Sequence, residues 1–290
     1  MNAVANASIP LVHRGVLRVS GEERAGFLQG LLTGDLMAVS ADTALYAALL
    51  TPQGKILHDL FIAAAGDALL LDVEAARLPD LLQRLGRYRL RAKVAFEDVS
   101  DRFQVLALPG DPAFGPALEL PPRAGACMAY RAGGVAMVDP RHPALGLRLL
   151  APRDEAAAGR FEDYDRLRLE LGVGDGSGDF GEGAMLALEA NLDALNGVSF
   201  SKGCYVGQEV TARSHHRALI RRRLRPVRVD GPLPAPGTPI LSGDREAGEL
   251  RSGRDGLALA LLRTEALETI GAPLTAGDAR LTPLVAVWDR

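Results

Sequence analysis

The sequence predicts an α+β protein in which two related lobes are followed by a small β-barrel domain. In the first lobe, strand-like runs and one amphipathic helix follow in the order β-β-α-β, which differs from the βαβ order of nucleotide-binding folds. The second block of the chain echoes that order. After Arg223 the sequence consists of short runs of alternating apolar and polar residues that are interrupted by prolines. This pattern is typical of a small barrel. We therefore assign residues 1–222 to the two-lobed core, with a lobe boundary near 109–122, and residues 223–290 to the barrel.

The first lobe is defined by alternating apolar runs and by one helical stripe. A Gly-Asp pair at residues 66–67 separates two apolar runs, as expected for a turn between paired strands. Leucines at helical spacing then precede Gly86, which indicates an amphipathic helix and its end. The expected elements are a strand at Val16–Val19, a helix start at Ser20–Glu23, strands at 56–64 and 68–73, a helix at Glu74–Leu85, and strands at Leu90–Phe96 and Phe103–Leu108.

The second lobe and the barrel are separated from the first lobe by turn-rich sequence. Pro109 to Pro122 is rich in Pro and Gly and indicates a boundary loop. Gly172 is placed to cap the C-terminus of a long helix. The expected elements are strands at 126–130, 135–138 and 145–150, a helix at Glu155–Leu171, and one brief helix near Thr264–Ile270 within the barrel.

The bulk composition is that of an ordinary globular protein. The 290 residues carry a net charge of −3, so bulk charge does not indicate a nucleic-acid-binding protein. Two cysteines exclude a disulfide framework and a cluster held by four thiolates of one chain. Residues 1–10 lack the pattern of a secretion signal, and Leu57–Val73 is too polar to span a bilayer. We expect a cytoplasmic protein with no membrane partner and no metal site of its own.

Residues 199–209 contain the densest group of chemically special side chains. Cys204 lies two positions after Lys202, and a nearby cation favours the thiolate, which is the reactive form of a cysteine. Gly203 and Gly207 permit backbone conformations that other residues rarely adopt. Cys204 is thus a candidate reactive and exposed thiol, and the alternative is a buried, inert cysteine. Cys127 lies in an alternating apolar run and is expected to be buried.

The string Lys-Gly-Cys-Tyr-x-Gly-Gln-Glu at residues 202–209 resembles the signature of the YgfZ-type family. Members of that family are tetrahydrofolate-binding relatives of the glycine-cleavage aminomethyltransferase and are linked to the upkeep of iron–sulfur enzymes. The resemblance extends to Phe27–Gly30 and Leu32–Asp35. It implies a tetrahydrofolate-binding factor for the assembly, maintenance or repair of iron–sulfur proteins, including radical enzymes of tRNA modification. Implied partners are iron–sulfur enzymes or assembly proteins, with weak tRNA contact.

The resemblance also implies site residues. Pro52–Leu60 resembles the segment that carries the catalytic aspartate of the aminomethyltransferase relatives, which makes Asp59 the candidate folate-contacting carboxylate. The relatives have two adjacent aspartates, and His58 stands in place of the first. No counterpart of the relatives' Thr-Gly-Glu segment is found near Pro143–Arg148, so the pterin contacts stay unassigned. The candidate catalytic residues are Cys204, Lys202 and Asp59, and the candidate folate-binding residues are Asp59, Arg168, Glu189, Tyr205 and Glu209.

Arg168 is indicated by two arguments. Arg168–Gly172 resembles the relatives' Arg-Leu-Glu-x-Gly, whose arginine contacts folate. Independently, the helix that carries Arg168 has an apolar stripe through Tyr164 and Leu171, and a guanidinium beside such a stripe needs an anionic partner or a path to water. A surface salt bridge is the alternative for this residue.

Two other functions stay open at this level. The first is a folate-dependent one-carbon transferase in which Asp59 polarises a folate nitrogen, so whether the protein is an enzyme is undecided. The second is a non-catalytic protein that binds RNA or a partner through the arginines of residues 217–228. Because the chain is acidic overall, we expect any RNA binding to be weak. Adjacent His215 and His216 would point in different directions and do not suggest a metal site.

Overall fold

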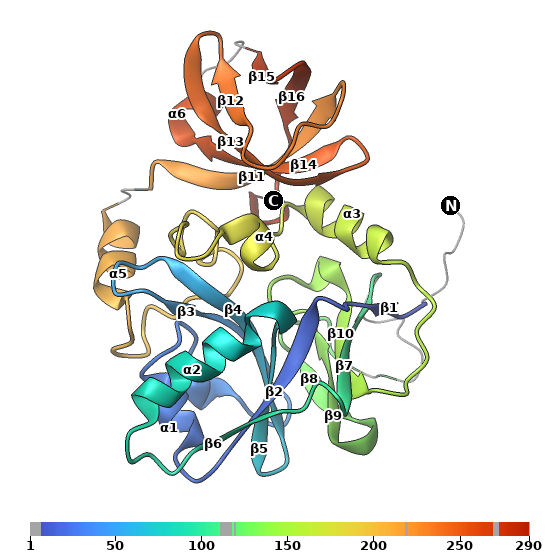
Figure 1. Cartoon of the computed structure of the whole chain (residues 1–290), viewed down its shortest axis with the longest axis vertical. Helices are drawn as coiled ribbons and strands as arrows, with labels where there is room; N and C mark the ends of the chain where they lie inside the picture. Colours follow the sequence, from blue (N-terminus) through green and yellow to red (C-terminus); the bar gives the residue numbers. More distant parts are fainter. Residues whose placement is uncertain (1–6, 111–117, 119, 218–219, 269–272, 290) are drawn as a thin grey trace.

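The computed structural model describes residues 7–110, 118, 120–217, 220–268 and 273–289. Two five-stranded sheets form the core, and a closed six-stranded barrel lies beyond them. Figure 1 shows helices α3 and α4 in a layer between the sheets and the barrel. The predicted α+β core with a C-terminal barrel is therefore confirmed.

The first sheet is antiparallel, with the strand order β3-β4-β5-β2-β6, and its helices cover one face. Leucines of α2 pack with Leu60 and Ile62 of β4, while Phe61 between them belongs to a different apolar cluster. Strand β4 is thus covered on both faces. The elements are β2 (Arg14–Ser20), α1 (Arg24–Gln29), η1 (Leu36–Ala38), β3 (Leu45–Leu50), β4 (Ile56–Ala65), β5 (Ala68–Glu74), η2 (Ala75–Arg77), α2 (Leu78–Arg89) and β6 (Ala95–Asp98).

The second sheet is also antiparallel, with the order β1-β7-β10-β9-β8. Because β7 pairs with β10 along its whole length, the chain changes sheet before β7. The boundary predicted near 109–122 is therefore not the boundary between the sheets, and β1 from the N-terminal end also joins this second sheet. The elements are β1 (Ile9–Pro10), β7 (Phe103–Leu108), β8 (Cys127–Tyr130), η4 (Arg131–Gly133), β9 (Gly134–Val138), η5 (Pro143–Leu145) and β10 (Leu147–Pro152).

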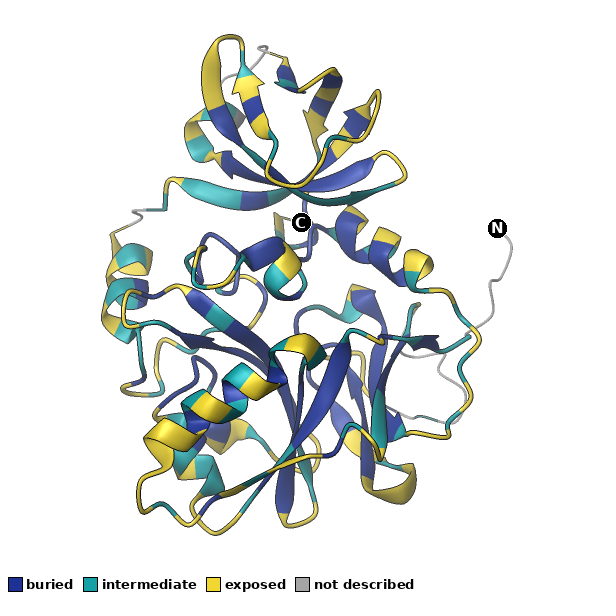
Figure 2. Ribbon diagram, in the orientation of Figure 1, coloured by how far each residue is buried: buried dark blue, intermediate teal, exposed yellow. Residues whose placement is uncertain are grey.

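The helices after the second sheet join the core to the barrel. Helix α3 contacts β13 and β14 of the barrel, and its Phe161 and Tyr164 also pack with apolar residues of the second sheet. One apolar cluster combines core residues such as Phe180 with barrel residues such as Leu259, and Figure 2 shows this buried layer. A Cβ on Gly172, whose φ is +83°, would lie 2.8 Å from the ring of Pro226. The connecting helices are α3 (Phe161–Leu171), α4 (Gly176–Phe180) and α5 (Gln208–His216).

The barrel closes through the pairing of β11 with both β14 and β16, and its interior is apolar. The last two residues of the helix predicted near Thr264–Ile270 lie outside the described residues. Among the described residues, no helix is both long and apolar enough to cross a membrane. The elements are β11 (Arg222–Asp230), β12 (Pro239–Ser242), β13 (Arg245–Arg254), β14 (Leu257–Arg263), α6 (Thr264–Glu268), β15 (Leu274–Ala276), β16 (Ala279–Pro283) and η6 (Val287–Asp289).

Several predicted element boundaries are wrong. Helix α2 begins at Leu78 rather than Glu74, since a proline in its first turn favours a start there. It also continues through Gly86 to Arg89, and the strand predicted at Leu90–Phe96 forms only at Ala95–Asp98. Helix α3 begins at Phe161, six residues later than predicted. Helix α5 was not predicted, because residues 208–216 carry only a weak apolar stripe.

Candidate functional site

The loop that precedes α5 is held to the first lobe by Lys202. The Lys202 ammonium donates hydrogen bonds to the backbone oxygens of Gln29 (2.7 Å), Leu32 (2.6 Å) and Gly34 (2.7 Å). Burial lowers the pKa of Lys202 to about 8, and Asp35 opposes that shift. An ammonium has three N–H donors, and three carbonyl oxygens accept them here. Lys202 thus anchors the loop between Val198 and Gly207 to the segment that follows α1.

Two further residues of the signature hold the loop from its other side. Tyr205 is buried, and this burial raises the pKa of its hydroxyl to about 12. Gly207 has a φ of +84°, and a Cβ there would lie 2.6 Å from the backbone oxygen of Thr51. The first turn of α5 also contacts Gly54 through Thr211. The Pro-Gln-Gly-Lys turn at residues 52–55 and the signature at 202–209 are therefore adjacent in the fold.

Cys204 lies at the exposed tip of this anchored loop, whereas Cys127 is buried, as predicted for both. A Cβ on the neighbouring Gly203 would have no atom within 4 Å. Burial raises the pKa of the Cys127 thiol to about 11, which disfavours its thiolate at neutral pH. The ring of Phe200, in the same loop, stacks on that of His215 of α5 with centroids 3.9 Å apart. The described part of the chain thus presents one accessible thiol.

Lys202 has a different environment from the one that the sequence suggested. It was expected to favour the thiolate of Cys204, but its three N–H donors are directed to backbone oxygens and its Nζ lies 5.2 Å from the centre of the Tyr205 ring. Its contacts therefore give it a positioning role in the loop.

Asp59 lies in a buried ion-pair cluster between the two sheets. It is 3% exposed, and Arg14 of β2 donates to it over 3.2 Å. Asp72 of β5 accepts a hydrogen bond from Arg14 (2.6 Å) and another from Arg148 of β10. Burial raises the pKa of Asp59, while the charge of Arg14 opposes the shift. This carboxyl is therefore enclosed by protein groups rather than open to solvent.

Three arginines of this cluster surround one aromatic ring. The guanidinium carbons of Arg14, Arg141 and Arg148 lie 5.4, 4.8 and 3.8 Å from the centre of Phe61, within the range of cation–π contacts. Among the described residues, two buried atoms of the cluster have no hydrogen-bond partner, Nη2 of Arg148 and Oδ1 of Asp175. Sequence reasoning missed these arginines, although an arginine within the apolar strand β10 is a signal that could have indicated a buried ion pair.

Arg168 belongs to a second cluster that joins α3 to α4 and the barrel. Its Nε donates to Asp165 (2.8 Å), its Nη1 to Asp179 (2.7 Å) and its Nη2 to Ser252 of β13 (3.0 Å). The predicted need for an anionic partner is thus met by protein carboxylates, and each nitrogen of this guanidinium already donates. The surface salt bridge weighed as an alternative is wrong, because Arg168 is 5% exposed.

Asp175 connects the two clusters. Its backbone N–H donates to Asp179 (2.9 Å), and its carboxylate lies 3.5 Å from Arg14. Asp59 and Arg168, which are far apart in the sequence, are therefore brought into one continuous buried network.

His58 points away from that network. Adjacent residues of a strand face opposite sides of the sheet, so Asp59 faces the second sheet and His58 faces α2. Its Nε2 lies 2.8 Å from Asp80, and burial lowers the pKa of His58 to about 4. The histidine that replaces the first of the relatives' two aspartates thus has a contact of its own with α2.

The other two predicted ligand residues lie apart from the Asp59 cluster. Glu189 is buried and accepts hydrogen bonds from the backbone of Leu186 (3.0 Å) and from Arg222 (2.9 Å). Glu209 is exposed in the first turn of α5 and pairs with Arg213, one turn later. The structure does not bring these two carboxylates together with Asp59 or Arg168.

Three of the six arginines at residues 217–228 are engaged in ion pairs with described residues. Arg222 binds Glu189, Arg223 binds Asp193, and Arg225 binds Asp289. These contacts join the barrel to the core and to the chain end. Within the described ranges, no three His, Cys, Asp or Glu side chains are arranged to hold a metal ion.

Comparison with known proteins gives consistent similarities. Residues 7–114 match the family described as GCVT N-terminal domain, and residues 221–290 match the family described as CAF17, C-terminal beta-barrel domain. The protein of Mus musculus named iron-sulfur cluster assembly factor IBA57, mitochondrial, is 35% identical over 99% of this chain and 85% of its own length. The protein of the same name from Homo sapiens is 37% identical over 88% of this chain and 77% of its own length.

A solved structure has the same fold. The glycine cleavage system aminomethyltransferase T from Bartonella henselae superposes with a TM-score of 0.76 and covers 99% of this chain and 87% of its own. The two sequences are 16% identical, so this likeness concerns the fold.

Proposed function

Because this chain belongs to the IBA57/CAF17 (YgfZ-type) family, we propose that it acts as an iron–sulfur cluster assembly factor whose working group is the exposed thiol of Cys204. It is a homologue of iron-sulfur cluster assembly factor IBA57. The mouse and human relatives are named mitochondrial, and a cytoplasmic location for this chain stays a prediction.

The observation that carries the proposal is an accessible thiol on a loop held by specific contacts. The loop is held at Lys202 by three carbonyl oxygens and at Gly207 by close contact with Thr51, so Cys204 is presented at a defined place. Thiolates are the usual protein ligands of iron–sulfur clusters, and a cluster takes about four protein ligands. Since Cys127 is buried, this chain supplies one thiolate. The other ligands come from a partner, an assembly protein or the iron–sulfur enzyme that receives the cluster.

Tetrahydrofolate binding forms the second part of the proposal, but Asp59 and Arg168 do not fit a direct role in it. Asp59 is enclosed by Arg14, and every nitrogen of Arg168 already donates to a protein group. Among the described residues, the cluster keeps one buried donor without a hydrogen bond, Nη2 of Arg148, whereas the buried Oδ1 of Asp175 has no hydrogen bond but lies 3.5 Å from Nη1 of Arg14. Nη2 of Arg148 is the atom of the cluster to which a ligand could bond without breaking an existing pair, so folate recognition is assigned to it.

The remaining functions have less support from the geometry. A one-carbon transferase needs a carboxylate that contacts the reacting nitrogen, and Asp59 is enclosed and paired with Arg14. RNA binding through residues 217–228 is weakened because Arg222, Arg223 and Arg225 already pair with carboxylates. A role in the assembly or maintenance of clusters in radical enzymes of tRNA modification is proposed from the family resemblance alone.

The thiol proposal is tested by comparing Cys204→Ser with Cys127→Ser. Under anaerobic conditions, the purified protein is mixed with a cluster-loaded assembly protein, and cluster absorption is followed during transfer to an acceptor enzyme. We expect Cys204→Ser to abolish formation of the complex in which this chain and the assembly protein share the cluster. Cys127→Ser should still form that complex. Iodoacetamide at neutral pH should label Cys204 first, because Cys127 is buried. Unchanged transfer by Cys204→Ser would refute the thiol assignment.

The folate assignment is tested separately by calorimetry. Tetrahydrofolate should bind the parent protein, and Arg148→Lys should weaken binding because it removes the unpaired Nη2. A saturating ligand at about 100 times its dissociation constant would add about 2.7 kcal/mol to the free energy of unfolding. Absence of both heat and thermal stabilisation would end the folate assignment and leave the thiol assignment unaffected.

A further inference from the structure

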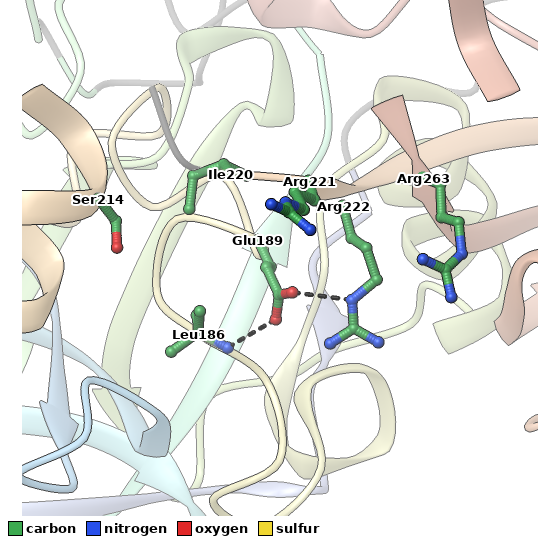
Figure 3. Close-up of a pocket in the computed structure, with 7 residues that line it drawn as sticks. All are labelled: Leu186, Glu189, Ser214, Ile220, Arg221, Arg222 and Arg263. Atoms are coloured by element: carbon green, nitrogen blue, oxygen red, sulfur yellow. Dashed lines mark hydrogen bonds and ion pairs between the residues drawn. The ribbon is translucent and has the colours of Figure 1, made fainter. Parts of the chain in front are cut away.

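A pocket with a volume of about 330 Å³ lies where the core, α5 and the barrel meet. Figure 3 shows its walls, which come from four segments of the chain. Glu189 comes from the core, Ser214 from α5, Arg221 and Arg222 from the start of the barrel, and Arg263 from the end of β14. The pocket is separate from the buried cluster that contains Asp59, and none of its lining residues belongs to the signature at 202–209.

The charges that line the pocket do not balance. It contains three arginines and one carboxylate, which leaves an excess of two positive charges. Glu189 already accepts two hydrogen bonds, from Arg222 and from the backbone of Leu186. Figure 3 shows both bonds. Glu189 is the one acid among the described lining residues, and each of its carboxylate oxygens already accepts a hydrogen bond.

The arginines keep donors for another partner. Arg221 makes no side-chain hydrogen bond or ion pair with any described residue. Arg222 uses Nε for Glu189, and within the described part of the chain its two terminal nitrogens have no acceptor. The carboxylate paired with Arg263 is Glu246, 4.0 Å away, which is the outer limit of an ion pair. Ser214 adds a hydroxyl to the same pocket.

These features define a ligand class. Two unbalanced positive charges match a dianion, and arginine binds phosphate oxygens through paired N–H groups. Leu186 and Ile220 provide an apolar wall beside the arginines. The volume lies near the lower end of the range for small-molecule sites, about 300–1,000 Å³. We propose that this pocket binds a small molecule that carries a phosphate or diphosphate group.

The location gives such a ligand a structural effect. Ser214 lies on the helix that begins directly after the signature, whereas Arg221 and Arg263 belong to the barrel side of the pocket. A phosphate bound between them joins α5 to the barrel. Binding therefore stabilises the folded chain and adds a contact between the barrel and the helix that follows the thiol-bearing loop.

The proposal is tested on the full chain by titration with inorganic pyrophosphate and with ADP, followed by calorimetry and by thermal unfolding. Adenosine serves as the ligand without phosphate. We expect one site for pyrophosphate and ADP and no binding of adenosine. Arg221→Ala and Arg263→Ala should each weaken binding about tenfold or more, because each removes a charge-assisted contact.

The matched control is Arg228→Ala, which removes another exposed arginine, from β11, outside the pocket. It should bind pyrophosphate like the parent protein. Because Arg221 and Arg263 are exposed, their variants should keep the circular dichroism spectrum of the parent. Equal weakening by Arg228→Ala would overturn the proposal, since it would indicate attraction by general surface charge.

An oligoribonucleotide provides the last comparison. If it binds and depends on Arg221 and Arg263 while pyrophosphate and ADP do not bind, the pocket belongs to an RNA interface and the small-molecule proposal is wrong. Absence of binding by every phosphate compound would overturn it as well. Neither result bears on cluster transfer by Cys204, which is measured independently.

Discussion

Asp72→Asn tests whether the buried arginines depend on a single carboxylate. The Asp72 side chain is 0% exposed and accepts hydrogen bonds from Arg14 and from Arg148, whose side chains are 0% and 1% exposed. Asparagine keeps the shape but removes the negative charge, and its amide N–H₂ would face an N–H donor of one arginine. Breaking a buried ion pair costs about 3–5 kcal/mol. Arg14 keeps Asp59 at 3.2 Å, so the main loss is expected at Arg148, whose remaining carboxylate, Asp139, lies 3.8 Å away.

The matched control is Asp67→Asn on the adjoining turn. Asp67 also pairs with an arginine, Arg18, over 3.1 Å, but its side chain is 88% exposed, so its loss should cost about 0–1 kcal/mol. Urea unfolding followed by circular dichroism measures both variants. At about 2–4 °C per kcal/mol, Asp72→Asn should lower the melting temperature by roughly 10 °C. Equal and small effects of the two substitutions would refute the reasoning, because Asp59 and Asp139 would then be sufficient partners for Arg14 and Arg148.

Two further predictions concern the signature loop and acid stability. Gly207→Ala should destabilise the protein more than Gly203→Ala. Both glycines have a positive φ, which costs an alanine about 1–2 kcal/mol, but only the Cβ at 207 would clash with the backbone of Thr51, which costs about 1–3 kcal/mol more. Equal melting temperatures of the two variants would contradict this. His58 has its pKa lowered from 6.5 to about 4, so the unfolded chain binds its proton first as the pH falls. Stability present above pH 6.5 should therefore be lost towards pH 4, by roughly 3 kcal/mol. His58→Gln should lose less between pH 7 and pH 4.5 in urea titrations, and an unchanged pH dependence would show that His58 is not kept neutral.

Local features of the sequence were sufficient for much of the secondary structure. The turn at Gly66-Asp67 separates β4 from β5 as predicted, and Gly172 ends α3 in the left-handed conformation that favours glycine. The short alternating runs and prolines after Arg223 correctly predicted a barrel. Each of these signals acts over a few neighbouring residues, which is why it can be recognised in the sequence.

The site was predictable to a smaller extent. Exposure of Cys204 and burial of Cys127 followed from glycines on one side and an apolar alternation on the other. The role of Lys202 did not follow, because its acceptors are backbone oxygens of residues 29–34, and such acceptors have no sequence signature. The exposed thiol and the anchoring lysine lie two positions apart in one loop, yet only the exposure of the thiol could be predicted from local sequence.

Tertiary structure alone decided which charges meet. The sequence places Asp59 and Arg168 within apolar elements, where a charge requires a partner. It did not determine the partners, since Asp72 reaches Arg148 across two sheets and Asp179 reaches Arg168 across two helices. It also did not place β1 and β7 in the second sheet. Such pairings depend on the closure of long chain segments, whose cost and geometry are set by the whole fold rather than by neighbouring residues.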